Sequence, residues 1–345
     1  MRVAVVVLNW NNLDYLRRFV PGILASLGPQ DRLFVADSGS TDGSLAFLEK
    51  EYPSVGLIPL GENHGFAGGY DLALARIPDA EYFVLLNSDI EVDEGWLEPL
   101  ARWMEEHPQT AVCGPKLHAL DPSAEGYVRT DRFEYAGAAG GWLDRYGFPY
   151  CRGRVLQNVE IDRGQYDSPA KVFWITGACM MVRASVWREL GGLDSEFFAH
   201  MEEIDFCWRA QLAGGEIWTV PDSVVWHIGG GTLAPSSPLK LKLNYRNSIW
   251  MLRKNLPATL GPRKAARRIF ARKVLDFGTQ LVYFLQGKWS YVRAVSQARR
   301  EARARKVVPA PAGAKVALTD VRIIAAWAFK REKVFDYLRE YESSN

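Results

Sequence analysis

The chain has 345 residues, of which 48% are apolar and 24% charged, and its formal net charge is +2. This is the balance of a folded protein that can bury a substantial core in one large domain with an appendage or in two ordinary domains. No stretch approaches the roughly 18 apolar residues that cross a bilayer, so we expect no integral membrane protein.

Apolar runs alternate with amphipathic stretches in the first third of the chain. Ser40 and Thr41 are candidate N-caps of the second of these helices. Because continuous apolar strands alternate with helices, the pattern predicts a doubly wound, mostly parallel α/β sheet covered on both faces. Ligands of such sheets bind beyond the carboxyl ends of the strands. The predicted strands are 3–8, 33–36, 55–60 and 82–86, and the predicted helices are 13–27, a segment ending near 52, 66–76 and 94–106.

The rest of the chain is less regular. Residues 115–170 are rich in Gly, Tyr and Arg and lack clear periodicity. From about residue 257 the chain predicts basic helices, and residues 306–317 resemble a Pro/Ala/Gly linker. We therefore predict an α/β domain at 1–255 and a basic, amphipathic helical extension at 256–345. The later predicted elements are strands 172–176, 179–182, 216–220 and 224–227 and helices 202–212 and 319–341.

Charge is unevenly distributed along the chain. Residues 263–306 contain thirteen Lys or Arg and two acids, a local charge of +11, so the remainder carries −9. An anionic partner is expected, and a membrane, a nucleic acid or an acidic protein would each satisfy this charge. An apolar stripe accompanies the basic residues, which favours either a helix packed on the body or binding to an anionic membrane surface. The stripe comprises Phe270, Val274, Phe277, Leu281 and Phe284.

The four cysteines have wide, irregular spacing and form no CxxC pair. This usage predicts a reduced, cytoplasmic protein. The apolar run after Met1 and Arg2 ends at Asn9, which is too short for a signal peptide and suits a buried strand.

Polar clusters follow each of the first four predicted strands. Asn9 and Asn11 follow the first strand, and Asp37 begins the segment after the second. Asn63 and Gly65 lie in a glycine-rich turn after the third. Each cluster alone is typical of an ordinary turn. Together they line the edge where α/β sheets bind nucleotides, and glycines there let backbone N–H groups approach a diphosphate.

Carboxylates and a histidine form the candidate catalytic set. Asn87 and Asp89 leave the fourth strand on the same face, where a carboxylate can bind a hard cation that bridges diphosphate oxygens. A helix N-cap region is the alternative. Glu202 and Glu203 open a predicted helix, where acids also occur simply to complement the helix dipole. His227 ends a strand beside three glycines, where an imidazole could complete a metal site.

These motifs, in their order along the chain, resemble the inverting family 2 glycosyltransferases of the GT-A fold, and most closely their bacterial rhamnosyltransferase-type branch. The resemblance extends from about residue 3 to 255, and as a set the motifs are specific. The matching segments are Val6–Asn11, Asp37–Gly43, Asn63–Gly69, Leu86–Asp89, Thr176–Ala178, Gly191–Asp194, Glu202–Asp205 and Trp226–His227.

The resemblance implies a role for each matching position. Asn9, Asn11 and Asp37 would hold the nucleoside, Asn63 and Gly65 would face the ribose and diphosphate, and Asn87 also belongs to the nucleotide-binding set. Asp89 and His227 would bind a divalent cation, Mg²⁺ or Mn²⁺. Glu203 would be the general base, although its extra methylene relative to the family's usual Asp leaves Glu202 as an alternative. The donor-sugar or acceptor pocket would comprise Trp174, Gly177, Ala178, Asp205 and Arg209.

The implied reaction moves a sugar from a nucleotide-sugar donor, a dTDP- or UDP-sugar such as dTDP-rhamnose, to a glycan or lipid-linked saccharide acceptor. The implied location is the cytoplasm, with peripheral attachment to the inner face of the plasma membrane. A sugar nucleotidyltransferase is the enzyme alternative, but the basic glycine-rich loop of that class does not follow Leu8. A nucleic-acid-binding protein is the third class, although no recognised module accompanies the basic segment, so no nucleic acid is expected.

Overall fold

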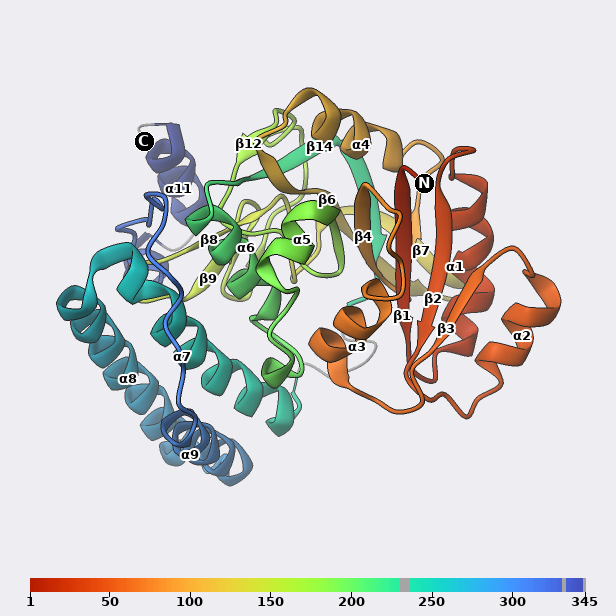
Figure 1. The fold of residues 1–345 in the computed structure, drawn as a ribbon. Coiled ribbons are helices and arrows are strands. Elements are labelled where there is room, and N and C mark those ends of the chain that lie inside the picture. The colour runs from red at the N-terminus through yellow and green to blue at the C-terminus, as the bar shows by residue number, and fades with distance from the viewer. Residues whose placement is uncertain (230–235, 331–332, 344–345) are drawn as a thin grey trace.

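A ten-stranded sheet lies at the centre of the computed structural model, which describes residues 1–229, 236–330 and 333–343 (Figure 1). β5 (Ile90–Val92) pairs with β14, and β7 (Gly126–Phe133) pairs with β6. The other strands lie in the spatial order β12 (Ala170–Lys171), β14 (Glu216–His227), β6 (Thr110–Ser123), β13 (Cys179–Arg183), β4 (Tyr82–Asn87), β1 (Val3–Asn9), β2 (Arg32–Asp37) and β3 (Gly56–Pro59).

Strand direction brings the polar strand ends to one edge of this sheet. β1 is parallel to β2 and β4, with Asn9 opposite Asp37 and Leu8 opposite Asn87. β13 is antiparallel to both β4 and β6, and β14 is parallel to β6. The carboxyl ends of β4 and β14 therefore point the same way, which carries Asn87 and His227 to the same edge.

Helices cover both faces of the sheet, as the strand–helix alternation predicts. Val3, Val5 and Val7 of β1 belong to one hydrophobic cluster, and Ala4 and Val6 belong to the other. One strand contributes to both clusters because its successive side chains point to opposite faces of the sheet. The first face packs against α1 (Leu13–Ala25), α2 (Ser44–Glu51) and α4 (Leu97–Glu106), and the second against α3 (Gly65–Leu74), α5 (Ala184–Leu190) and α6 (Glu202–Leu212).

Three long helices follow the sheet domain. They are α7 (Pro238–Leu260), α8 (Pro262–Leu285) and α9 (Trp289–Ala304). α7 packs against α6, and α8 and α9 pack against α7 (Figure 1). The domain boundary expected at residue 255 falls inside α7. No helix in the described ranges is long and apolar enough to span a bilayer.

The aperiodic middle segment forms a small antiparallel sheet that the end of the chain covers. Its strands are β8 (Gly141–Leu143), β9 (Pro149–Cys151), β10 (Arg154–Val155) and β11 (Asn158–Val159). A hydrophobic cluster joins Tyr150 and Val155 of this sheet to Ile323, Val334 and Leu338. Those last three residues belong to α10 (Ile323–Lys330) and α11 (Val334–Ser343).

Four local predictions were wrong. The strand expected at 172–176 is reduced to a bridge between Trp174 and Gly141. The Trp174 ring fills the space that a side chain at Gly141 would need. The strands expected at 216–220 and 224–227 are one strand, β14, whose register shifts between Thr219 and Val224. Pro221 lies within this shift and has no N–H for the ladder.

The other two wrong predictions concern helix ends. α2 begins at Ser44 instead of beside Ser40 and Thr41, and the Asp42 carboxylate accepts the Ser44 N–H at 3.0 Å. The helix expected at 319–341 is replaced by α10 and α11, and residues 331–332 between them lie outside the described ranges.

All four cysteines are buried and free.

The contact between α10 and the small sheet gives a test of the C-terminal region. Ile323 is fully buried, whereas its neighbour Ile324 is 41% exposed. Ile323→Ala should lower the free energy of unfolding by about 2–5 kcal/mol because it leaves a cavity. Ile324→Ala should change it by less than about 0.5 kcal/mol. Urea denaturation of both variants would measure the difference, and equal values would contradict this packing.

Candidate functional site

The ends of β1 and β2 are joined by side-chain hydrogen bonds. Asn9 Nδ2 donates to Asp37 Oδ2 at 2.8 Å, and Asp37 Oδ1 accepts the Gly39 and Ser40 N–H groups at 3.1 and 2.8 Å. Asn11 Oδ1 accepts the Thr41 N–H at 2.8 Å. Asn9 and Asp37 are buried, and Asn9 Oδ1 has no hydrogen-bond partner among the described residues. The three predicted nucleoside-binding residues therefore lie together and shape one pair of loops.

The glycine-rich turn is closed by the segment that precedes α6. Asn63 Oδ1 accepts the Gly65 N–H at 2.9 Å, and the Phe198 carbonyl accepts the N–H groups of Phe66 and Ala67 at 2.7 and 3.2 Å. Gly65 has a φ of 72°, and a Cβ at this position would lie 2.5 Å from Phe198. Only glycine allows this approach. The first N–H groups of α3 therefore bond within the protein.

The second cluster joins the ends of β4 and β14. His227 Nε2 lies 3.1 Å from Asp89 Oδ1 and 3.4 Å from Asn87 Nδ2. On the other side of the ring, Nδ1 lies 3.5 Å from Glu134 Oε1. Asp89, Glu134 and His227 are all buried. The structure therefore brings the two predicted metal ligands, Asp89 and His227, into contact. Of the three glycines expected beside His227, Gly230 and Gly231 lie outside the described ranges.

The charges in this cluster stabilise one another. Burial opposes ionisation of Asp89, but the His227 imidazole outweighs it and lowers the pKa of the carboxyl. Burial likewise opposes protonation of His227, but Asp89 and Glu134 outweigh it and raise the imidazole pKa well above its usual value. The two carboxylates therefore favour positive charge at this position.

Asp89 and His227 fit a divalent cation as a pair of adjacent ligands. Two neighbouring ligand atoms about 2.1 Å from an octahedral ion lie about 3 Å apart, close to the 3.1 Å separation of Nε2 and Oδ1. Within the described part of the chain, no group of three or more His, Cys, Asp or Glu could hold a metal. Further ligands would have to come from a bound molecule or water.

The two adjacent glutamates open α6 after a segment of unusual backbone. Phe198, His200 and Met201 have φ values of 64°, 71° and 75°, in the left-handed region that non-glycine residues seldom adopt. Glu202 is 4% exposed, and burial together with the neighbouring Glu203 raises its pKa well above the usual value. Glu203 is partly exposed, and burial raises its pKa to about 7. One oxygen of each carboxyl, Glu202 Oε2 and Glu203 Oε2, is buried and has no hydrogen-bond partner among the described residues.

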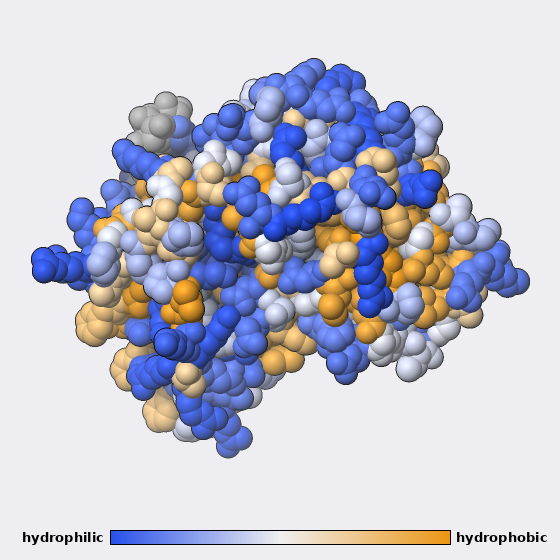
Figure 2. Space-filling view, viewed as in Figure 1, coloured by the Kyte–Doolittle hydropathy of each residue, from blue (hydrophilic) through white to orange (hydrophobic). Residues whose placement is uncertain are grey.

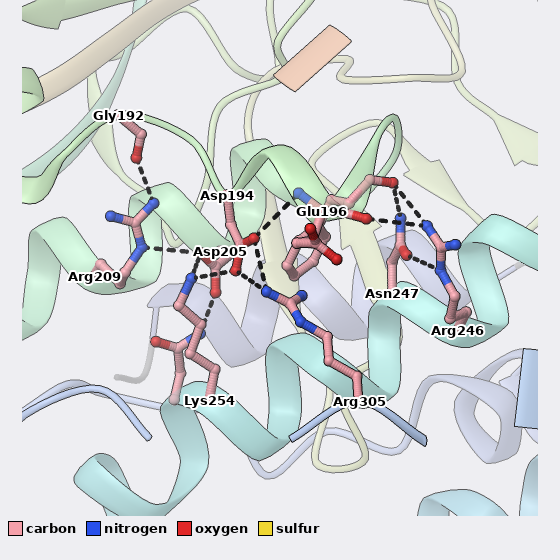
Figure 3. A network of polar contacts seen from close by, with 11 residues as sticks. Gly192, Asp194, Glu196, Asp205, Arg209, Arg246, Asn247, Lys254 and Arg305 are labelled. Carbon is pink, nitrogen blue, oxygen red and sulfur yellow. Dashed lines mark hydrogen bonds and ion pairs between the residues drawn. The ribbon is translucent and has the colours of Figure 1, made fainter. Parts of the chain in front are cut away.

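α6 is fixed to α7 through the Asp205 carboxylate (Figure 3). Asp205 is fully buried; its Oδ2 accepts hydrogen bonds from Arg209 Nε and Lys254 Nζ, both at 2.9 Å, and its Oδ1 accepts one from Asn255 Nδ2 at 2.7 Å. Arg209 also donates to the Leu190 and Gly192 carbonyls. Asp205 and Arg209 thus contact protein groups, and their assignment to a sugar pocket stays a prediction.

α7 and the end of α9 also hold the segment 194–201 (Figure 3). The buried Asn247 amide donates to the carbonyls of Phe197, Ala199 and His200 at 2.9, 2.8 and 2.7 Å. The Asp194 carboxylate accepts hydrogen bonds from Lys254 and Arg305. These bonds hold the carbonyls of the strained segment and fix the direction from which α6 begins.

Of the remaining predicted pocket residues, Gly177 and Ala178 lie close to α3 and β4, whereas Trp174 lies against β8. A Cβ on Gly177 would lie 2.6 Å from the Phe66 ring, and the Ala178 carbonyl accepts the Asn87 N–H at 2.9 Å. Trp174 is buried, and its indole N–H donates to the Trp142 carbonyl at 3.2 Å. Gly177 and Ala178 therefore support the cluster at the end of β4.

Sequence reasoning missed Glu134, Asn247, Lys254 and Arg305. Glu134 lies in the aperiodic segment 115–170. Asn247 and Lys254 are single polar residues on α7, and Arg305 directly follows α9; all three are far along the chain from their partners. A polar residue that interrupts the apolar face of a helix is the only local signal, and Asn247 and Asn255 of α7 show it.

This sheet, with the polar clusters along its carboxyl edge, has the GT-A fold of a class of glycosyltransferases. Residues 4–191 match the model of glycosyl transferase family 2, and the chain belongs to that family. The chain is therefore a glycosyltransferase and not a sugar nucleotidyltransferase.

Known proteins agree with this assignment. The chain is 25% identical over 239 residues to an N-acetylglucosaminyl-diphospho-decaprenol L-rhamnosyltransferase of Mycobacterium tuberculosis, covering 65% of this chain and 75% of the relative. It superimposes on S. aureus TarS 1–349 in complex with UDP-GlcNAc with a TM-score of 0.54 and 16% identity, covering 100% of this chain and 91% of TarS. GalNAc-T7 with UDP, GalNAc and Mn²⁺ gives a TM-score of 0.58 and 16% identity, covering 73% of this chain and 47% of that chain.

The role of Asn247 can be tested by removing its amide. Asn247→Leu should lower the free energy of unfolding by about 1–3 kcal/mol because the carbonyls of Ala199 and His200 lose the amide donor and that of Phe197 loses one of its donors. It should also speed hydrogen exchange in residues 194–205 more than in β1 or β4. Asn244→Leu, which removes a single bond to the Lys240 carbonyl, is the matched control. Uniform exchange in both variants would contradict the positioning role.

Proposed function

We propose that the chain is a metal-dependent, inverting glycosyltransferase that moves a sugar from a nucleotide-sugar to an acceptor hydroxyl. The buried contact between Asp89 and His227, 3.1 Å apart at the carboxyl edge of the sheet, carries this proposal. It supplies two cation ligands at the edge where α/β sheets bind nucleotides. The acids at the start of α6 supply a second function, proton acceptance.

The proposed donor is a dTDP- or UDP-sugar, with dTDP-rhamnose the preferred candidate because of the rhamnosyltransferase relative. Asn9, Asn11 and Asp37 would hold the nucleoside. The buried Asn9 Oδ1, which has no partner among the described residues, supports this role. Asn63, Gly65 and Asn87 would adjoin the ribose and diphosphate.

A divalent cation, Mg²⁺ or Mn²⁺, would be held by Asp89 and His227 and would neutralise the charge that develops on the departing nucleoside diphosphate. The Mn²⁺ in the GalNAc-T7 structure supports such an ion without fixing its identity in this chain. Glu134, 3.5 Å from His227 Nδ1, would orient the imidazole.

Glu203 is the proposed general base. A base needs access to the acceptor hydroxyl and a pKa near the working pH. Glu203 is partly exposed with a pKa of about 7, whereas Glu202 is buried with a pKa raised well above the usual value. The pKa of Glu203 is raised less than that of Glu202, which supports Glu203 as the base.

The proposed acceptor is a glycan or lipid-linked saccharide, as in the decaprenol-linked substrate named for the M. tuberculosis relative. The proposed location is the cytoplasm, at the inner face of the plasma membrane. Gly177 and Ala178, beside Phe66 and Asn87, are the proposed edge of the sugar pocket.

Removal of the cation tests the metal proposal. Calorimetric titration with UDP and dTDP should show binding in Mn²⁺ that EDTA weakens, and Asp89→Asn should abolish that metal dependence. The loss should be at least the roughly 10–100-fold typical of second-shell changes around a metal. Asp93→Asn, an exposed acid bonded to Arg129, is the control and should bind like the wild type. Equal affinities with and without metal in all proteins would refute the assignment.

Substitution of the two glutamates tests the base. Glu203→Gln should lower turnover by about 10²–10⁴-fold with little change in donor affinity, whereas Glu202→Gln should be milder. Because the base acts only when ionised, wild-type kcat/KM should fall as the pH drops below about 7. The reverse ranking would exchange the two roles, and full activity of both variants would place the base elsewhere.

A further inference from the structure

One face of α8 is apolar and largely exposed, with the Arg299 guanidinium of α9 over the Phe277 ring, 5.2 Å from its centroid. Its large side chains are 48–76% exposed, and they extend over roughly 22 Å of helix. Figure 2 shows apolar side chains along the outer edge of this helix, at the lower left. This exposed face continues to Trp289 at the start of α9, whose ring lies 5.1 Å from that of Phe284. Its residues are Phe270, Val274, Phe277, Leu281, Val282, Phe284, Leu285 and Trp289.

Arginines continue this face toward the start of α8. Two arginines and five apolar residues share one side of the helix, because they recur at alternating spacings of 4 and 3. They are Arg263, Arg267, Phe270, Val274, Phe277, Leu281 and Phe284. Arg263 and Arg267 are exposed and form no ion pair with any residue that the structure describes. Two uncompensated cations therefore border a large apolar surface.

The opposite face of α8 packs on the protein. Ala265, Arg272 and Asp276 are buried, and Arg272 Nε donates to Asp276 Oδ1 at 2.9 Å and Arg272 Nη1 to the Gly147 carbonyl at 2.9 Å. The apolar side chains therefore do not pack on the rest of the protein, which contacts the opposite side of the helix. Exposed aromatic and aliphatic side chains over this length are costly in water unless a partner covers them.

Charge decides which partner fits. α8, which the structure describes throughout, has Asp276 as its single acid, and that acid is bonded to Arg272. A second copy of α8 would offer no carboxylate to Arg263 and Arg267. An anionic lipid surface offers phosphates to the arginines and an acyl boundary to Phe277, Leu281 and Trp289.

We infer that the α8 face defined by Arg263, Arg267 and the eight apolar residues docks on an anionic bilayer, with the helix lying in the plane of the headgroups. α9 adds cations to this surface through the exposed Arg293, Arg300 and Arg303. Docking on the bilayer would bring the enzyme to a lipid-linked acceptor, and this one statement rests on the proposed function. α7 connects the exposed face of α8 to the glutamates of α6, because α7 packs against α8 and its Asn247 bonds to the segment before Glu202.

Sedimentation of the full chain with vesicles tests the inference without donor, metal or turnover. Binding should be strong to phosphatidylcholine containing about 30% phosphatidylglycerol and weak to phosphatidylcholine alone, since each basic residue contributes about fivefold. Phe277→Ser with Leu281→Ser should reduce binding at least tenfold. Arg263→Glu with Arg267→Glu should abolish the preference for phosphatidylglycerol. Lys50→Glu with Arg102→Glu makes the same change in charge at exposed sites outside α8 and is the control.

The outcomes separate this inference from the proposed function. All variants should keep wild-type melting temperatures and wild-type UDP binding, because the altered side chains are exposed and lie outside the proposed nucleotide site. Wild-type chain that ignores phosphatidylglycerol, or α8 variants that sediment like the control, would overturn the inference. A concentration-dependent dimer that Phe277→Ser with Leu281→Ser converts to monomer would also overturn it, by showing that a second copy covers the face.

Discussion

The arrangement of the catalytic edge depends on one buried charge, the carboxylate of Asp205. A carboxylate removed from water is strongly destabilising unless it is paired and hydrogen-bonded. Arg209, Lys254 and Asn255 supply that compensation from α6 and α7. The first turn of α6 can therefore occupy a single position relative to α7, and the glutamates that open α6 inherit that position.

A second constraint comes from strand direction. Parallel pairing of β1 with β2 and β4 brings three polar loops to one edge, and the parallel pair of β6 and β14 adds His227 to the same edge. Asp89 and His227 meet although 138 residues separate them. The sheet positions the proposed cation ligands and nucleoside-binding loops, and α6 positions the two glutamates proposed for proton transfer. The two groups of residues are joined where Phe198 contacts the start of α3.

Much of this architecture could be predicted because its causes are local. Buried parallel strands appear as continuous apolar runs, so β1, β2 and β4 were placed within one or two residues, and α6 was predicted with its observed ends. The position of Glu134 and the hydrogen bonds of Asn247 could not be predicted, because they depend on tertiary contacts with residues distant in the chain. Pro221 was visible in the sequence, but whether it ends a strand or shifts its register depends on how β6 pairs beside it.

The Phe198 carbonyl has a thermodynamic consequence. It accepts the Phe66 and Ala67 N–H groups and belongs to the same strained segment that leads into Glu202. An anion that bonded to those amides would have to displace this carbonyl, so occupancy of the α3 amides and the conformation of residues 197–201 are linked equilibria. Reciprocity then requires that any substitution that stabilises the present backbone of this segment weakens anion binding at α3 by the same free energy.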